Sequence, residues 1–214
     1  SMYNLTSGQW ERSSWPSVDV SSSSANASIA VNSTNSPFAV WIDYRDSVVL
    51  GRVYYSWYND VAKNWTNNSV LMDNKTARAY SVDVAIGYND TILVVWDDDR
   101  DTDLSGNYFE TYYRVYNNTK VWTNDTALTS DDNIDSGTPA VAAGYDDIYY
   151  ITWSEVVAGK YEVFLKAINA TTGLAIGSLK GITSSDCADS YKSDVAVTTN
   201  NIEHTVWEDK RVGT

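Results

Sequence analysis

The chain has 214 residues, of which 28 are acidic and 15 are lysine or arginine, so its formal net charge is −13. A surface of this sign repels phosphate backbones and argues against nucleic acid as a partner. Aromatic residues make up 13% of the chain, which excludes a disordered chain. The length suits one large or two small domains, and no apolar run is long enough for a membrane-spanning helix.

The chain contains four copies of one repeat. Its most regular mark is a tryptophan at the end of a short apolar run: Trp41, Trp96, Trp153 and Trp207, which are 55, 57 and 54 residues apart. Twelve residues before each of these comes an apolar residue: Ile29, Val84, Val141 and Val195. Nineteen residues earlier still come Trp10, Trp65, Trp122 and Ile176. Both offsets hold without a gap, so the repeat cores are expected at residues 10–41, 65–96, 122–153 and 176–207.

Each repeat has the pattern of β-structure throughout. Short apolar or alternating runs are separated by clusters of Asn, Asp, Gly and Ser, and no helical periodicity appears. Four short strands in about 55 residues are typical of one blade of a β-propeller. We therefore predict an all-β fold, with a single propeller domain over residues 1–214 and four four-stranded blades.

The last blade is expected to be shared between the N- and C-termini. The fourth copy stops after the strand of Trp207, and the chain begins just before the strand of Trp10. N-terminal strands that pair with C-terminal strands would complete this blade and remove its open edge. The seam is about six residues shorter than the other connections. Three alternatives follow: a short seam blade, a fragment of a larger ring, or two chains that close one ring by self-association.

The repeat sequences "AVWIDYRD", "VVWDDDRD" and "TVWEDKRV" share the pattern Trp-x-Asp-x-Arg after an apolar run, and an aromatic strand follows it in the first two copies. This pattern resembles TolB-type and sialidase-like propeller repeats of prokaryotic cell-surface proteins, including archaeal ones. The resemblance covers essentially the whole chain and implies a β-propeller. The Ser-x-Asp-x-Gly-x-Thr-Trp box of sialidases does not occur, and a propeller fold by itself specifies no activity.

A carboxylate lies two residues after each repeat tryptophan, and in three copies an arginine lies two residues further on. These residues are Asp43 with Arg45, Asp98 with Arg100, Glu155 without an arginine, and Asp209 with Arg211. An acid and a base two residues apart leave a strand on the same side and can pair. On an exposed rim such a pair contributes about 0–1 kcal/mol and serves mainly to hold the turn. The alternative is a ring of carboxylates at one mouth of the channel that attracts a cation.

The second copy carries an additional acidic stretch. Oxygen-bearing side chains fall at alternating positions close to those of an EF-type calcium loop: Asp99, Asp101, Asp103, Ser105, Asn107 and Glu110. The sixth position is Leu104, where such a loop needs glycine, and no helices flank the stretch. Two readings stay open, a calcium site formed by Asp99, Asp101, Asp103, Asn107 and Glu110, and a solvated acidic hairpin.

Ten Asn-x-Ser/Thr sequons suggest an N-glycosylated extracellular or cell-surface protein, although Asn and Thr are also common in turns. They start at Asn4, Asn26, Asn32, Asn64, Asn67, Asn74, Asn89, Asn117, Asn124 and Asn169. Cys187 is the single cysteine, so no disulfide forms within the chain. No catalytic triad or phosphate loop can be assembled. Our main hypothesis is therefore an extracellular binding or adhesion module for a protein or carbohydrate; the alternatives are a propeller glycoside hydrolase or lyase, and a structural spacer.

Overall fold

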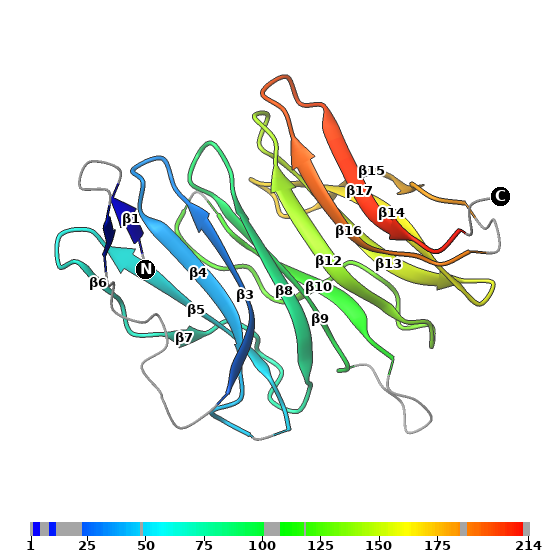
Figure 1. Ribbon diagram of the computed structural model, residues 1–214, viewed down its shortest axis with the longest axis horizontal. Helices are drawn as coiled ribbons and strands as arrows, with labels where there is room; N and C mark the ends of the chain where they lie inside the picture. Colours follow the sequence, from blue (N-terminus) through cyan, green and yellow to red (C-terminus); the bar gives the residue numbers. More distant parts are fainter. Residues whose placement is uncertain are drawn as a thin grey trace.

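The computed structural model describes residues 2–4, 9–11, 23–47, 49–100, 108–117, 119–184 and 188–211. Every regular element in these residues is a β-strand, and the strands form antiparallel sheets that follow one another in an arc (Figure 1). This confirms the all-β prediction. Within the same residues, no helix is long and apolar enough to cross a membrane.

Three of the repeats form complete sheets. The first blade contains β3 (Ser24–Val31), β4 (Pro37–Asp43) and β5 (Arg52–Asn59), with β6 (Asn64–Trp65) and β7 (Ser69–Val70) at its outer edge. The second contains β8 (Ala79–Ile86), β9 (Ile92–Asp98), β10 (Glu110–Tyr116) and β11 (Thr126–Ala127). The third contains β12 (Ser136–Ala143), β13 (Ile148–Val157), β14 (Lys160–Asn169) and β15 (Ala175–Gly181).

The fourth blade differs from the prediction. It consists of β16 (Ser190–Val197) and β17 (Glu203–Asp209), which pair only with each other among the described strands. The N-terminal strands β1 (Met2–Asn4) and β2 (Gln9–Glu11) form a separate two-stranded sheet. In Figure 1 this sheet lies at the end of the arc opposite β17. The expected closure of blade four by the N-terminus is therefore not present in the described part of the chain.

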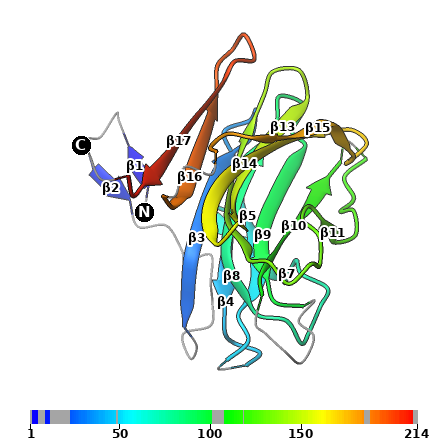
Figure 2. The ribbon, with the colours of Figure 1, turned by 90° about the vertical axis from the view of Figure 1, so that its right-hand side faces the viewer.

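The first strands of successive blades contact one another, so β3, β8, β12 and β16 run side by side. Seen from the side, β3 and β16 lie toward one edge of the molecule and the outer strand β11 toward the other (Figure 2). Each blade is thus arranged radially, with its first strand innermost. This is the order of strands in a propeller blade.

The turn between the first two strands, here called the first turn, has the same conformation in every blade. Equivalent positions carry a positive φ: Asn35 (62°), Asp90 (57°), Asp147 (59°) and Asn201 (59°). Asn and Asp adopt this left-handed conformation more readily than other side chains. The first turns therefore fix the register of each hairpin, and two of them directly follow a glycine, Gly87 and Gly144.

The hydrophobic core lies between the blades. Trp96 packs with Phe38, Val40 and Ile42 of the first blade, and it is fully buried. Trp153 packs in the same way with Leu93 and Val95 of the second blade. The repeat tryptophans of these two copies therefore belong to the core between blades.

Candidate functional site

The repeated carboxylates are bound by the tryptophans that precede them. The indole Nε1 donates to the acid two residues later in every copy: Trp41 to Asp43 (2.8 Å), Trp96 to Asp98 (2.7 Å), Trp153 to Glu155 (3.0 Å) and Trp207 to Asp209 (3.5 Å). The arginines pair with the same acids at 2.6 Å in the first, second and fourth copies. In the first two copies the acid therefore ties a buried tryptophan to the backbone of the following turn.

Two of these acids do not lie on the exposed rim that the sequence suggested. The side chains of Asp43 and Asp98 are fully buried. Burial pushes the pKa of Asp43 upward, but hydrogen bonds from Arg45 and Trp41 outweigh it and hold the pKa at about 2. The oxygens of both acids already accept hydrogen bonds from protein donors. Such groups serve as structural acceptors, and a ring of cation-attracting carboxylates stays only a prediction.

Most of the predicted calcium loop lies outside the described residues, including Asp101, Asp103 and Asn107. At its two ends, Asp99 Oδ1 accepts a hydrogen bond from the backbone N–H of Arg78 (2.6 Å), and buried Glu110 accepts one from Thr129 (2.5 Å). Burial raises the pKa of Glu110 to about 7. No cluster of three His, Cys, Asp or Glu side chains suited to a metal occurs in the described residues. The calcium site therefore remains a prediction.

If this hairpin binds calcium, millimolar calcium should raise the melting temperature, because the ion would stabilise only the folded state. The double substitution Asp101→Ala with Asp103→Ala should abolish that rise and leave the melting temperature without calcium unchanged. Thermal unfolding with calcium and with chelator measures both effects. If calcium does not raise the melting temperature of the parent protein, the stretch is a solvated acidic hairpin and not a calcium site.

Several of the sequon asparagines have a structural role in turns. The side-chain oxygens of Asn32, Asn74 and Asn117 each accept hydrogen bonds from both the backbone N–H and the hydroxyl of the threonine two residues later. This arrangement needs the Asn-x-Thr pattern for the turn alone. It supplies a physical reason for the many sequons, and N-glycosylation remains a prediction.

The best candidate for a binding site is a hollow of about 510 Å³ at the end of the blades opposite the first turns. Three blades contribute to it. The lining residues are Tyr80, Asp97, Phe109, Asp135, Gly137, Thr138, Ser154, Tyr161, Asp189, Tyr191, Lys192 and Lys210. We call this hollow the inter-blade pocket. Its volume lies within the range of small-molecule sites, roughly 300–1,000 Å³.

Asp97 is the most buried carboxylate of the inter-blade pocket, with 3% of its surface exposed. Its two oxygens accept hydrogen bonds from the backbone N–H groups of Ser81 (2.6 Å) and Thr138 (2.9 Å), which belong to adjacent blades. Burial raises the pKa of the Asp97 carboxyl above its ordinary value. A Cβ at Gly137 would lie 2.7 Å from Asp97 Oδ2, so this glycine leaves the space that the carboxyl group occupies.

Two further carboxylates lie where the third and fourth blades begin. Asp135 accepts a hydrogen bond from the backbone N–H of Phe109 (3.0 Å), and Asp189 accepts one from that of Tyr161 (3.3 Å). Asp189 also lies 3.9 Å from the ammonium group of Lys210. These acids are equivalent positions of successive repeats and are only partly buried.

Aromatic rings frame these carboxylates. Tyr80 and Phe109 are in contact, with ring centroids 5.7 Å apart, and Lys210 lies 4.9 Å from the centre of the Tyr191 ring. Aromatic rings can stack on the face of a sugar, and the carboxylates and lysines beside them can bind its hydroxyl groups. The pocket is therefore equipped for a polar ligand with an apolar face.

The sequence analysis did not identify the inter-blade pocket. One signal was available, because the positions equivalent to Asp97 are occupied by Ile42, Ser154 and Glu208. The position of Asp97 thus differs from copy to copy, whereas the position of Asp98 is acidic in all four. The aromatic residues of the pocket gave no such signal, since they come from loops and strand ends of different copies.

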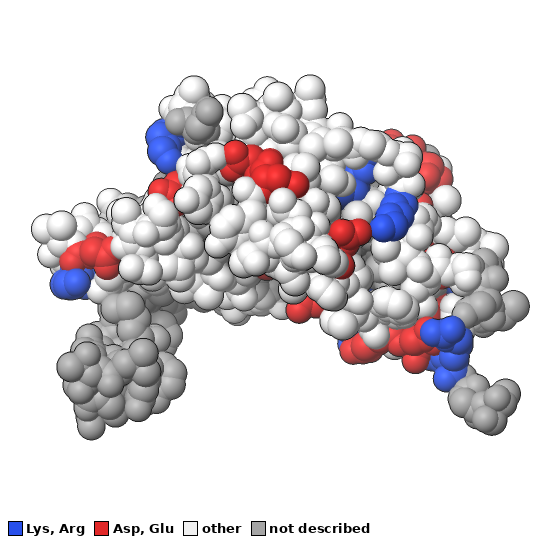
Figure 3. Space-filling model, turned by 90° about the horizontal axis from the view of Figure 1, so that it is seen from above, with Lys and Arg blue, Asp and Glu red and all other residues white. Residues whose placement is uncertain are grey.

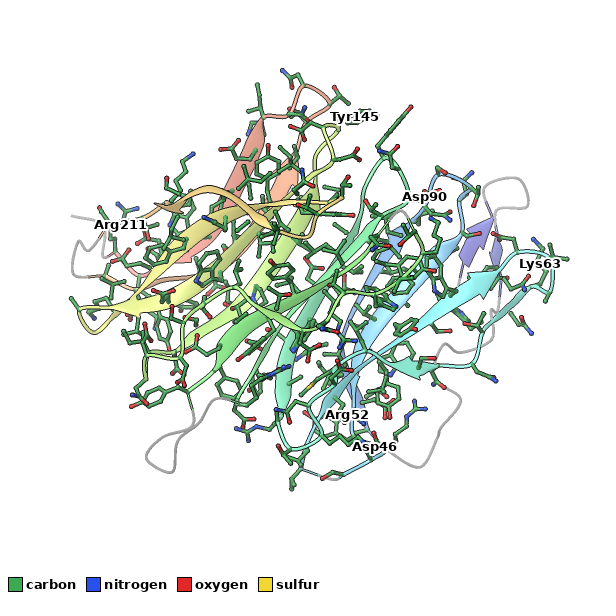
Figure 4. The ribbon with its side chains drawn as sticks, turned by 180° about the vertical axis from the view of Figure 1, so that it is seen from behind. Asp46, Arg52, Lys63, Asp90, Tyr145 and Arg211 are labelled. Atoms are coloured by element: carbon green, nitrogen blue, oxygen red, sulfur yellow. The ribbon has the colours of Figure 1, made fainter. Side chains whose placement is uncertain are left out.

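The opposite end of the molecule is chemically different. A second hollow of about 540 Å³ lies among the first turns and is lined by Val31, Asn32, Ser33, Ile86, Gly87, Tyr88, Ala143, Gly144 and Tyr145, with no carboxylate. Seen from this end, the surface is mostly uncharged, with acidic side chains in separate groups (Figure 3). Figure 4 places Asp90 and Tyr145 at this end and Asp46 with Arg52 at the other. The carboxylate-lined pocket therefore stands out as the candidate site for chemistry.

No protein-family model and no curated protein matches the chain. Solved structures do match it in fold. An α-L-arabinanase from Penicillium chrysogenum has a TM-score of 0.57 and 11% identity over 85% of this chain and 58% of its own. A GH93 α-L-arabinofuranosidase of Fusarium graminearum has a TM-score of 0.52 and 15% identity over 84% and 51%. The polysaccharide lyase Uly1 has a TM-score of 0.53 and 12% identity over 79% and 42%.

The chain thus spans only about half the length of these solved structures. A sialidase of Streptococcus pneumoniae matches at a TM-score of 0.50 and 12% identity. The likeness supports the sialidase-like part of the predicted resemblance, and nothing bears on the TolB-type part. The fold of this chain is that of the sialidase-like and arabinanase-like β-propellers.

Proposed function

We propose that this chain is a carbohydrate-active propeller that binds a glycan in the inter-blade pocket and cleaves its glycosidic bond. The observation that carries the proposal is the combination of three carboxylates and four aromatic rings around one hollow of about 510 Å³. This reading reverses the order of our sequence hypotheses, since cleavage now stands ahead of simple binding.

The carboxylates of the pocket have environments suited to different roles. Glycosidases use one carboxyl group that donates a proton to the leaving oxygen and a second that stabilises or attacks the sugar, or activates water. Asp97 is the candidate proton donor, because burial raises the pKa of its carboxyl group. Asp135 and Asp189, which are more accessible, are the candidates for the second role. Water then supplies the hydroxyl group and the proton that complete hydrolysis.

The aromatic residues supply the binding surface. Tyr80 and Phe109 lie on the second blade and Tyr191 on the fourth, so rings stand on both sides of the carboxylates. Stacking of sugar faces on such rings holds a polysaccharide chain across the blades. Solved structures of the same fold include an arabinanase complexed with arabinobiose and a polysaccharide lyase, so arabinan and other polysaccharides are the first substrates to test. An extracellular location, which the sequons suggested, agrees with such a substrate.

The test is a glycan panel that includes arabinan, sialylated glycans and uronic acid polymers, with release of reducing ends and of unsaturated uronate as separate readouts. We expect hydrolysis of at least one glycan, and a fall in rate of about 10²–10⁴-fold in Asp97→Asn. Asp135→Asn and Asp189→Asn distinguish the second carboxylate. Tyr191→Ala should weaken binding of the same glycan.

The matched control is Tyr145→Ala, which removes an exposed tyrosine at the opposite end of the blades and should leave turnover unchanged. Circular dichroism verifies that each variant is folded. A glycan that binds in calorimetry without any product would identify a binding module, as our first hypothesis held. A panel with neither binding nor product contradicts both readings and favours the structural spacer.

A further inference from the structure

We propose that the two ends of the arc are complementary surfaces, and that two copies of this chain join end to end to close one ring. The C-terminal end is the free face and edge of β16 and β17, here called the tail end. The N-terminal end is the free face of β3 and β4, here called the head end. In this assembly the tail end of each copy binds the head end of the other.

Both ends expose apolar side chains that the inner blades bury. At the tail end, Val206 is 65% exposed, whereas its counterparts Val40 and Val95 are fully buried between blades. At the head end, Ile29 is 60% exposed, whereas its counterpart Val84 is buried. The repeat itself indicates the contact, because every internal junction covers these positions with a neighbouring blade.

The first turns of the blades show how a junction is bonded. The backbone N–H of Ser33 donates to Asp90 Oδ1 on the next blade (2.8 Å), and that of Tyr145 donates to Asn201 Oδ1 (2.7 Å). Thr199 is the donor position of the fourth blade, and Asn35 is the acceptor position of the first. Asn35 also has the same positive φ as the acceptors already in use. Thr199 of one copy can therefore donate to Asn35 of the other.

The innermost strands provide a second bond of the same kind. The backbone N–H of Val141 on the third blade donates to Asp83 Oδ2 on the second (2.8 Å). The corresponding pair across the proposed junction is Ile29 N–H at the head end and the exposed carboxylate of Asp194 at the tail end. Two hydrogen bonds of the internal junctions can therefore form between copies, because the head end and the tail end together carry the donor and the acceptor of each.

The N-terminal hairpin supplies a third feature. Tyr3 pairs with Trp10 in β1 and β2, as Tyr58 pairs with Trp65 in the first blade and Tyr116 with Trp122 in the second. The hairpin thus has the register of the outer two strands of a blade, and these are the strands that the described fourth blade lacks. Because it leads into β3, it belongs to the blade before the first, which in a two-copy ring is the partner's fourth blade.

The occupant is a second copy because the two ends of one copy lie apart. They stand at opposite sides of the arc in Figure 1. A second copy carries the same two ends, so its head end can bind the tail end of the first copy while its tail end binds the head end of the first. Head-to-tail contacts of this kind form closed rings when the rotation returns to the start.

Sedimentation velocity over a range of concentrations tests the proposal. We expect the full chain to sediment with the mass of two chains, and Val206→Glu and Ile29→Glu each with the mass of one. A mixture of these two variants should regain two-chain species, because one junction in the mixed pair has an unaltered tail and an unaltered head. Leu174→Glu, at another exposed apolar site, is the control and should not alter the mass.

A disulfide at the junction separates the two ways of closing a ring. Asn35→Cys with Thr199→Cys, in a Cys187→Ser background, should yield a disulfide-linked two-chain species on oxidation. A single chain at all concentrations, or a two-chain species that neither end variant weakens, would overturn the proposal. A disulfide within one chain would overturn it as well, since the ends of one copy would then meet.

Discussion

Asp98→Ala is expected to lower the free energy of unfolding by about 3–5 kcal/mol, the range for removing one partner of a buried ion pair. Asp98 is fully buried and accepts hydrogen bonds from Trp96 Nε1 (2.7 Å) and from Arg100 Nε (2.8 Å) and Nη2 (2.6 Å). Its loss leaves the indole N–H without an acceptor and Arg100 with Asp125 as its remaining anionic partner. Urea unfolding of the variant and the parent protein measures the difference.

The repeat provides the matched control for this experiment. Asp209 holds the same position on β17, but its indole donor is 3.5 Å away and the side chain of its partner Arg211 is 60% exposed. Asp209→Ala should therefore cost much less than Asp98→Ala. If both variants lose the same free energy of unfolding, the turn sequence, and not burial between blades, determines how much this acid contributes to stability.

The repeat pattern predicted the strands well for a physical reason. The two constant offsets indicate where strands begin. The first runs from the outer tryptophan to the inner apolar residue, and the second from that residue to the repeat tryptophan. They stay constant because every blade needs strands and turns of the same length to pack on its neighbour. The Asn and Asp residues that adopt positive φ in the first turns fix the hairpin register in the same way. The bond from each indole to the following acid was not predicted. Spacing places the two side chains on one side of a strand, but burial between blades brings the N–H onto the carboxylate.

The inter-blade pocket could not be predicted by such reasoning, and for the closure of the ring the short seam left three alternatives. Tyr80, Tyr161 and Tyr191 come from three repeats, and only the stacking of blades brings them around one hollow. Closure depends on the angle between successive blades, which many small packing contacts determine together.

Asp83→Ala is the second substitution with a large expected effect, about 1–3 kcal/mol of unfolding free energy. Asp83 accepts hydrogen bonds from Ser28 Oγ on the first blade (2.7 Å) and from the backbone N–H of Val141 on the third (2.8 Å). It therefore connects three consecutive blades at their innermost strands. Without the carboxyl group, the Val141 N–H lies between blades with no acceptor.

The cost of Asp83→Ala should also depend on pH, in a direction that burial determines. Burial raises the pKa of Asp83 above its ordinary value of 3.8. The folded protein then binds the proton more tightly than the unfolded chain, so the stability that this group contributes is complete below pH 3.8 and is lost as the pH rises through the higher folded value. The difference between parent and variant should shrink over that rise. A difference that grows with pH would mean that the ionised form is the one stabilised.

The matching substitution at Asp194 tests the proposed contact between two copies. It is the counterpart of Asp83 on the fourth blade, where it is exposed at the tail end of the described chain. Asp194→Ala should therefore leave the stability of a single copy unchanged, because no blade covers it there. In the two-copy ring the same substitution should weaken association, since Ile29 N–H of the partner would lose its acceptor. Sedimentation and urea unfolding of this one variant thus separate what a carboxylate does inside a blade stack from what it does at a junction between copies.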